Sequence, residues 1–191
     1  ERWVLPRIDH ALVVVEESRD RLLALGMDAR RITVVGNTPS RARLVAMPPV
    51  VHSGGKPLEL IYLGLLEAPR GIGNVIDAMA EVRRAGTAVR LTIIGSGREH
   101  ETFVQRAREA GLVDDAVRFL GRVPNAEALR LLQAADVGLI PHIANESWNS
   151  TIPNKLFDYM AAGLAVLTSS AKPAARVVRE SSQSHDAVER S

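Results

Sequence analysis

Lys155 and Asp158 stand three residues apart in a helical pattern, which places their side chains on one face of the helix. A short polar stretch with Ser150, Thr151 and Asn154 precedes them. The start of a helix offers unpaired backbone N–H groups and the positive end of its dipole. A lysine there, with hydroxyl donors nearby, suits a phosphate group, and a carboxylate one turn later suits sugar hydroxyls. A plain helix cap with a surface ion pair is the alternative that these residues leave open.

A glycine-rich turn follows the apolar run 91–94 and contains Gly95 and Gly97. Glycines in such a turn let a backbone approach a pyrophosphate at the start of a helix. A dinucleotide site would have a third glycine where His100 stands, and an acidic residue after the next strand, where Gly121 follows instead. A nicotinamide-dependent dehydrogenase is therefore disfavoured. A phosphate or sugar contact and a plain tight turn both stay open.

Three further polar residues lie on turns that follow predicted strands. Arg70 follows the run 58–63, while His142 and Glu146 follow the run 136–140. By residue type alone, an isolated arginine is usually solvated, and a histidine more often packs or caps than transfers protons. Spacing alone therefore assigns none of these residues to catalysis.

Short apolar runs, each followed by Gly, Pro or small polar residues, predict the buried strands that position these side chains. They span 58–63, 90–94, 117–120, 136–140 and 164–167. Four helical patterns lie between or beside these strands, and each has an apolar face that is predicted to point inward. The four faces are, in chain order, Val75, Ile76, Met79 and Val82; Phe103, Val104 and Ala107; Leu129 and Leu132; and Phe157, Met160 and Ala161. This alternation predicts an α/β fold, a Rossmann-like, doubly wound parallel sheet. Ligands of such sheets bind outside the carboxyl ends of the strands.

The first part of the chain contains one βαβ unit and no more. Strand-like runs at 11–15 and 32–35 flank a helical pattern at 19–25, which Gly26 closes. The Pro- and Gly-rich segment after this unit has linker composition, and the chain ends in a polar tail. The predicted divisions are a leading βαβ remnant at 1–37, a linker at 38–57, an α/β domain at 58–180 and a tail at 181–191.

Composition narrows the classes of function. The 191-residue chain has no cysteine and no pair of histidines at a metal-ligand spacing, so we expect no metal site. The formal net charge is +2 and no long basic run is present, which disfavours nucleic acid as a partner. No apolar stretch approaches the ~20 residues that span a bilayer, and the first residues lack a signal-peptide layout. We expect a cytoplasmic protein that could work at the inner face of a membrane.

Several motifs, taken in order from about residue 1 to 180, form a recognisable series: Ile8-Asp-His-Ala-Leu-Val-Val-Val15, Ile32-Thr-Val-Val-Gly-Asn37, Ile61-Tyr-Leu-Gly64 with Arg70-Gly-Ile72, Leu91-Thr-Ile-Ile-Gly-Ser-Gly97, Val117-Arg-Phe-Leu-Gly-Arg-Val123, Ala135-Asp-Val-Gly-Leu-Ile-Pro141 and Pro153-Asn-Lys-Leu-Phe-Asp-Tyr-Met-Ala-Ala-Gly163. In this series the chain resembles the retaining glycosyltransferases of family 4, also called group 1, which have the two-domain GT-B fold. The resemblance implies that 1–37 end an acceptor-side N-terminal domain and that 58–180 belong to an incomplete donor-binding C-terminal domain, so we expect a piece of a longer enzyme.

The resemblance also implies roles for single residues. The implied donor-diphosphate contacts are Arg70, Thr151, Asn154 and Lys155, the implied nucleoside contacts are Gly95, Gly97, Val123 and Asp158, and the candidate sugar contacts are Ser150, Glu146 and His142. Two features depart from the family's pattern. Leu65 stands where an arginine often follows the first strand's glycine, and Ser150 and Asp158 stand where the family has two glutamates.

By this resemblance, the expected function is retaining transfer of a sugar from a nucleotide-diphosphate sugar (UDP-, GDP- or another) to a glycan or lipid-linked acceptor in glycan or glycolipid assembly. No cofactor is expected, and stabilising the charge of the leaving diphosphate would do most of the chemistry. The full-length enzyme could associate with a membrane surface, and the chain alone would be inactive without its acceptor domain. Two alternatives stay open: a non-catalytic nucleotide-binding fragment, and a sugar-nucleotide epimerase of the same fold that would use His142 and Glu146 as acid and base.

Overall fold

The computed structural model describes residues 3–38 and 57–188, with side chains up to residue 182. Contacts divide the chain into two compact units. The first comprises the described parts of Glu1–Thr38, Ala144–Asn154 and Ser170–Ser191, and the second those of Pro39–Ile143 and Lys155–Ser169. The predicted linker at 38–57 lies almost entirely outside the described residues.

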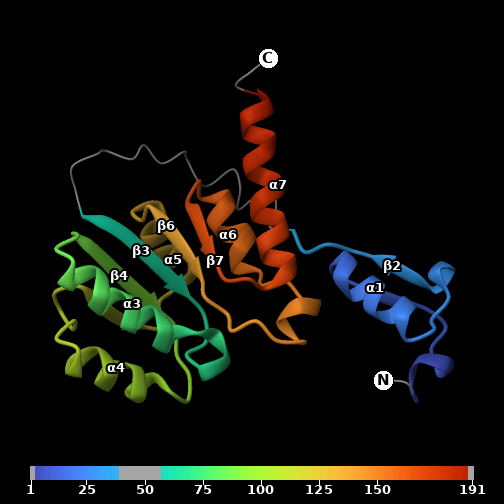
Figure 1. Ribbon diagram of the computed structural model, residues 1–191, viewed down its shortest axis with the longest axis horizontal. Helices are drawn as coiled ribbons and strands as arrows, with labels where there is room; N and C mark the ends of the chain where they lie inside the picture. Colours follow the sequence, from blue (N-terminus) through green and yellow to red (C-terminus); the bar gives the residue numbers. More distant parts are fainter. Residues whose placement is uncertain (1–2, 39–56, 189–191) are drawn as a thin grey trace. The chain divides into compact units, whose positions relative to one another are not determined.

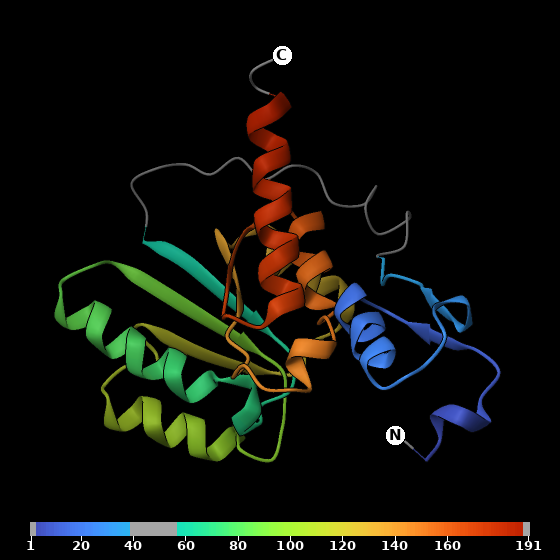
Figure 2. The same ribbon diagram turned by 45° about the vertical axis from the view of Figure 1, so that its right-hand side comes forward.

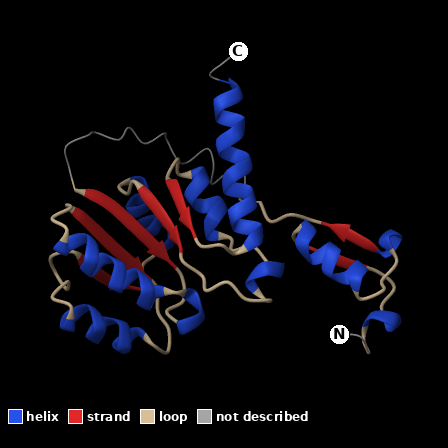
Figure 3. Ribbon diagram, viewed as in Figure 1, coloured by secondary structure: helices blue, strands red, loops and turns tan. Residues whose placement is uncertain are grey.

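The second unit is built on a five-stranded parallel sheet with the strand order β5-β4-β3-β6-β7. Its strands are β3 (Leu58–Leu63), β4 (Val89–Ile94), β5 (Val117–Gly121), β6 (Val137–Ile140) and β7 (Ala165–Thr168). Its helices are the short 3-10 helix η3 (Ala68–Arg70), α3 (Ile72–Arg84), α4 (His100–Glu109), α5 (Asn125–Gln133) and α6 (Lys155–Ala161). Helices α3 and α4 lie in front of the sheet and α5 lies behind it (Figure 1). Figure 3 shows the strands of this sheet as red arrows that point the same way.

Apolar side chains of the central strands and of one face of each covering helix form the core of this unit. In the middle of the sheet, Ile61, Leu91 and Ile93 are each 1% exposed. Strands buried on both faces read as near-continuous apolar runs, because neither face is selected for polar residues. On the helices, the buried residues include Ile76 and Met79 of α3, Phe103 and Ala107 of α4, and Leu132 of α5.

The predicted fold class is confirmed. All five predicted strands of the sheet are present, and each end lies within one residue of its predicted position. The inward faces predicted for α3 and α4 also agree with the buried residues of these helices.

Helix α6 turns a different face inward from the predicted one. Its buried side chains are Lys155, Leu156 and Tyr159, whereas Met160 is 37% exposed. The prediction placed Met160 inside and was wrong, because the ring of Tyr159 packs against the bare backbone of Gly138 on β6. A Cβ atom on Gly138 would come within 2.4 Å of that ring. The backbone of a neighbouring strand therefore selects the buried face of this helix.

The first unit contains the predicted βαβ unit: the parallel pair β1 (Ala11–Val13) and β2 (Ile32–Val34), with α1 (Glu16–Ala24) packed on it (Figure 2). It also contains η1 (Leu5–Arg7), η2 (Ala29–Arg31), η4 (Trp148–Ser150) and α7 (Lys172–Val188). Arg176 on α7 pairs with Glu17 on α1 at 2.8 Å, and the Ser18 hydroxyl donates to the Ser150 carbonyl. These bonds join three segments that are far apart in the sequence. Helix α7 extends into the segment predicted as a tail.

Candidate functional site

The chain reverses its direction of winding between β3 and β6. Strands β4 and β5 are added on one side of β3, and β6 and β7 on the other. In doubly wound sheets, ligands bind outside the carboxyl ends of the two strands at this reversal. The ladder between β3 and β6 pairs Leu60 with Val137 and Ile61 with Gly138, and so ends before the carboxyl ends are reached. We call the carboxyl ends of β3 and β6, with the turns that follow them, the switch point.

Arg70 and His142 meet at the switch point. Ile143 N–H donates to the Pro69 carbonyl at 3.1 Å, which fixes η3 against the segment after β6. Arg70 Nη1 lies 3.3 Å from His142 Nε2. A guanidinium group only donates, so the imidazole accepts through Nε2 and carries its proton on Nδ1. Burial, followed by the charges of Lys155 and Arg70, lowers the pKa of His142 to about 3, so the ring is uncharged at neutral pH.

Lys155 is the first residue of α6, and its side chain is buried at 8% exposure. Its Nζ lies 3.8 Å from the ring centroid of Tyr62 on β3, and 2.9 Å from the position that a Cβ atom on Gly64 would occupy. Burial, and then the charge of Arg70, lower the pKa of Lys155 to about 7. No hydrogen-bond acceptor among the described residues reaches Nζ. The interpretation as a surface ion pair is therefore wrong, and a buried ammonium of this kind is stabilised by an anionic ligand.

Tyr159 ties the two strands of the switch point together. Its hydroxyl accepts a hydrogen bond from Leu63 N–H of β3 at 3.0 Å and donates one to the Leu139 carbonyl of β6 at 3.4 Å. The side chain is fully buried, and burial raises the pKa of its phenol, so it keeps its proton. Because Tyr159 stands one turn after Lys155 on α6, the same contact fixes the start of this helix.

The glycine turn after β4 packs closely against the backbone that follows β3. A Cβ atom on Gly95 would lie 1.8 Å from the Gly64 carbonyl oxygen, and one on Gly97 would lie 2.1 Å from that of Leu66. Gly95 also has a φ of +143°, which disfavours other residues. Close packing therefore accounts for both glycines, and the nucleoside contact stays a prediction.

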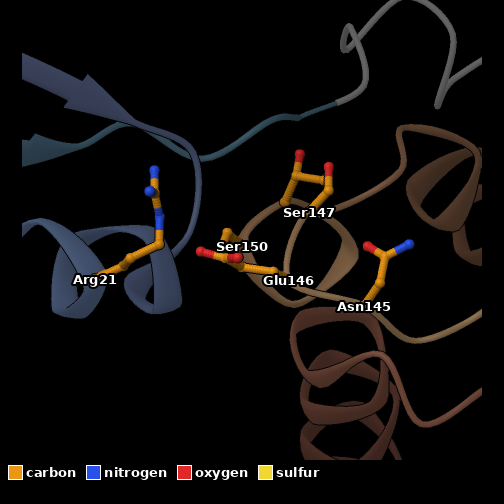
Figure 4. Close-up of a pocket in the computed structure, with 6 residues that line it drawn as sticks. Arg21, Asn145, Glu146, Ser147 and Ser150 are labelled. Atoms are coloured by element: carbon orange, nitrogen blue, oxygen red, sulfur yellow. The ribbon is translucent and has the colours of Figure 1, made fainter. Parts of the chain in front are cut away.

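The first unit carries a polar pocket of about 620 Å³. Arg21 extends from α1, and Glu146 and Ser150 come from the segment that ends in η4 (Figure 4). Asn145 stabilises that segment, because its side chain accepts a hydrogen bond from Trp148 N–H at 2.9 Å. Charges of both signs together with hydroxyl groups suit a ligand with many hydroxyl groups. The lining residues are Arg21, Asn145, Glu146, Ser147, Ser150 and Thr151.

The predicted site residues fall into two groups, one in each unit. Those of the second unit are Arg70, His142 and Lys155 at the switch point, Gly95 and Gly97 on the neighbouring turn, the half-buried Val123 after β5, and the half-buried Asp158 on α6. Those of the first unit are Glu146, Ser150 and Thr151 at the pocket and the exposed Asn154. Within residues 3–38 and 57–188, no cluster of three His, Asp or Glu side chains could hold a metal ion. In the same residues, no helix has both the length and the apolar character needed to cross a membrane.

Tyr62, Tyr159 and Arg21 were not singled out from the sequence. Both tyrosines stand among apolar residues, where an aromatic side chain is ordinarily part of the core. The available signal was spacing: Tyr62 stands two residues before Gly64, and Tyr159 stands four after Lys155, on the same helix face. Arg21 had no such signal, because its place at the pocket depends on a tertiary contact between α1 and η4.

The chain is similar to known proteins over most of its length. Residues 57–188 match the family model described as glycosyl transferases group 1. Phosphatidyl-myo-inositol mannosyltransferase of Mycobacterium leprae is 32% identical over 171 residues, which cover 87% of this chain and 42% of that protein. The apo structure of the lipopolysaccharide outer core galactosyltransferase WaaB matches with a TM-score of 0.67 at 21% identity, covering 84% of this chain and 43% of that one. Anabaena Alr3699/HepE in complex with UDP and glucose matches with a TM-score of 0.64 at 16% identity, and the match covers 86% of this chain and 45% of that one.

These matches agree with the architecture of the sheet. The structural neighbours are GT-B glycosyltransferases, which confirms the predicted fold. The chain spans less than half the length of the curated relatives that it matches. Since the family model covers more than half of this chain, the chain belongs to the group 1 glycosyltransferase family.

Proposed function

We propose that this chain supplies the nucleotide-diphosphate site of a glycosyltransferase, which moves a sugar from a nucleotide-diphosphate sugar to an acceptor with retention at the anomeric carbon. One observation carries the proposal: the buried ammonium of Lys155 meets no hydrogen-bond acceptor among the described residues and stands at the switch point of the sheet. A diphosphate supplies the oxygen acceptors and the negative charge that this ammonium lacks.

Arg70 and Lys155 would act on the leaving group. When the bond between the anomeric carbon and the diphosphate oxygen breaks, its electron pair stays on the diphosphate, and fixed positive charges stabilise that product most strongly in a buried site. His142 positions Arg70 by accepting from Nη1 at 3.3 Å. We propose that these side chains neutralise the diphosphate without a metal ion, so a chelator should leave nucleotide affinity unchanged.

The remaining predicted contacts are part of the same proposal. The pocket of the first unit, with Glu146, Ser150 and Thr151, has the size and polarity to hold a sugar ring. HepE in complex with UDP and glucose supports a nucleotide and a sugar as ligands. Relatives named glycogen synthase and phosphatidyl-myo-inositol mannosyltransferase support a glycan or lipid-linked acceptor for the longer protein. For that protein we also propose association with the inner face of a membrane.

Titration of the chain with nucleotides tests the proposal directly. UDP, GDP and ADP are added to the 191-residue chain in a calorimeter, with and without EDTA, and at least one should bind. Lys155→Ala should weaken the binding of that nucleotide by ~1.5 to 3 kcal/mol, or about ten- to a hundred-fold, the range for a charge-assisted hydrogen bond. The matched control is Lys172→Ala, which removes an exposed lysine and should leave affinity unchanged.

Two results would contradict the proposal. Absence of binding for every nucleotide diphosphate would remove the donor site from this chain. Equal affinity of the wild type and Lys155→Ala would show that the buried ammonium contacts no phosphate, even if a nucleotide binds elsewhere.

A further inference from the structure

The ring of Tyr62 lies against the ammonium of Lys155. It stands near the end of β3, is fully buried, and has its ring centroid 3.8 Å from Lys155 Nζ. Its hydroxyl donates to the Leu65 carbonyl at 2.8 Å, on the turn that follows the strand. A leucine could contribute to the core at this position but would make neither contact. Both the ring face and the hydroxyl of Tyr62 therefore make polar contacts at the switch point.

The ring and the turn together confine the ammonium. The face of an aromatic ring carries partial negative charge and attracts a cation, more strongly where water is excluded. A Cβ atom on Gly64 would lie 2.9 Å from Nζ, so only a glycine leaves the cation its present position. The same Cβ atom would lie 3.3 Å from the Tyr62 hydroxyl oxygen. Because that hydroxyl holds the turn at Leu65, one side chain fixes both the cation and the backbone beside it.

We propose that Tyr62 is a positioning residue, whose ring holds the ammonium of Lys155 at the switch point for the diphosphate of the donor and whose hydroxyl fixes the turn after β3. The inference rests on the proposed function, in which Lys155 binds the diphosphate. Tyr62 itself acts through Lys155 and has no assigned contact with the substrate.

Several charged and titratable groups bear on this ammonium. Burial, and then repulsion by Arg70 of η3, lower the pKa of Lys155 to about 7. His142 after β6 is uncharged at neutral pH, with its own pKa lowered to about 3 by burial and the neighbouring cations. Tyr159 and Asp158 share helix α6 with Lys155, and the phenol of Tyr62 keeps its proton because burial raises its pKa. Burial and Arg70 destabilise the charged form of Lys155, and the Tyr62 ring offsets part of this effect because it attracts the cation.

The test measures the titration of Lys155 without nucleotide and the binding of nucleotide separately. The side-chain resonances of 13C-labelled lysine are followed with pH in the wild type, Tyr62→Phe and Tyr62→Leu. The lysines of the chain are Lys56, Lys155 and Lys172, and the exposed Lys172 serves as an internal reference. Phe103→Leu is the matched control, because it removes a ring from the same core cluster.

Tyr62→Leu should lower the pKa of Lys155 by about one, while Tyr62→Phe and Phe103→Leu should leave it close to the wild-type value. The affinity for UDP or GDP should fall about ten-fold or more in Tyr62→Leu and stay within about three-fold in Tyr62→Phe, which keeps the ring.

An unchanged or raised pKa of Lys155 in Tyr62→Leu would overturn the inference, and so would an equal change of that pKa in Phe103→Leu. If the wild type binds no nucleotide, the proposed function fails, yet the lysine titration still decides whether the ring stabilises the cation. If the wild type binds and Tyr62→Leu binds equally well, the positioning role fails alone.

Discussion

Replacing Lys155 by methionine should make the protein more stable at neutral pH while abolishing the proposed nucleotide site. Methionine is similar in length to the lysine stem and fills the same buried space without a charge. Lys155 is 8% exposed and its ammonium has no hydrogen-bond acceptor among the described residues, so the substitution breaks no hydrogen bond to any of them. The expected stabilisation comes from the charge alone.

The magnitude follows from the titration of Lys155. An unfolded lysine titrates near 10.5, whereas burial and Arg70 hold the folded pKa to about 7. Between about pH 7 and pH 10.5, unfolding therefore takes up a proton, and the unfolded chain is increasingly favoured as the pH falls. The destabilisation is fully present below about pH 7, is on the order of 4 kcal/mol at pH 7, and falls to about 1 kcal/mol at pH 10. Methionine binds no proton and removes this pH-dependent contribution.

Urea unfolding of the wild type and Lys155→Met, followed by circular dichroism between about pH 6.5 and pH 10, measures this difference. The variant should be more stable by at least about 2 kcal/mol at pH 7, and the advantage should shrink towards pH 10. Lys172→Met is the matched control and should follow the wild type, because Lys172 is exposed. Added UDP or GDP should raise the stability of the wild type and of the control, but not that of Lys155→Met.

Either of two results would refute this reasoning. A variant that is less stable than the wild type at pH 7 would show that the ammonium stabilises the fold. A stability difference that is the same at pH 7 and at pH 10 would show that it does not arise from protonation of Lys155.

Three further predictions concern α6 and its contacts. Tyr159→Phe leaves the N–H of Leu63 without its acceptor and should lower the free energy of unfolding by ~1 to 3 kcal/mol in urea; no change would show that water replaces the hydroxyl. Gly138→Ala places a methyl group 2.4 Å from the Tyr159 ring and should cost ~1 to 3 kcal/mol by the same measurement, with partial recovery in the double variant Gly138→Ala/Tyr159→Leu. Asp158→Ala should weaken the binding of UDP or GDP more than that of the 2′-deoxy analogue in calorimetry, and equal losses would argue against a ribose contact.

Much of the sheet could be predicted from the sequence because its strands are buried on both faces. The run at 58–63 is apolar except for Glu59, and Gly64 marks its end. The order of the strands could not be predicted in this way. Strands β3 and β6 lie side by side, although more than seventy residues separate Leu60 from Val137 in the sequence. Local pattern carries no information about such a pairing.

Single candidate residues could be named from the sequence, but the way in which the fold arranges them could not. Arg70, His142 and Lys155 were named because each follows a predicted strand or opens a predicted helix. The contact of Arg70 with His142 depends on the strand order, which brings the turn after β3 next to the end of β6. The burial of Lys155 depends on which face α6 turns inward. That face is selected by Gly138, whose missing side chain leaves room for Tyr159.

The packing of α6 does not require a lysine at its first position. Leu156 and Tyr159 are fully buried and already attach the helix to the sheet. An apolar residue at position 155 would extend the same contacts and avoid the unfavourable burial of a charge near Arg70. Tyr62 and Gly64 instead leave a confined place for the ammonium. Perturbed, partly destabilising groups of this kind concentrate at functional sites, and the proposed diphosphate would account for a lysine that packing does not require.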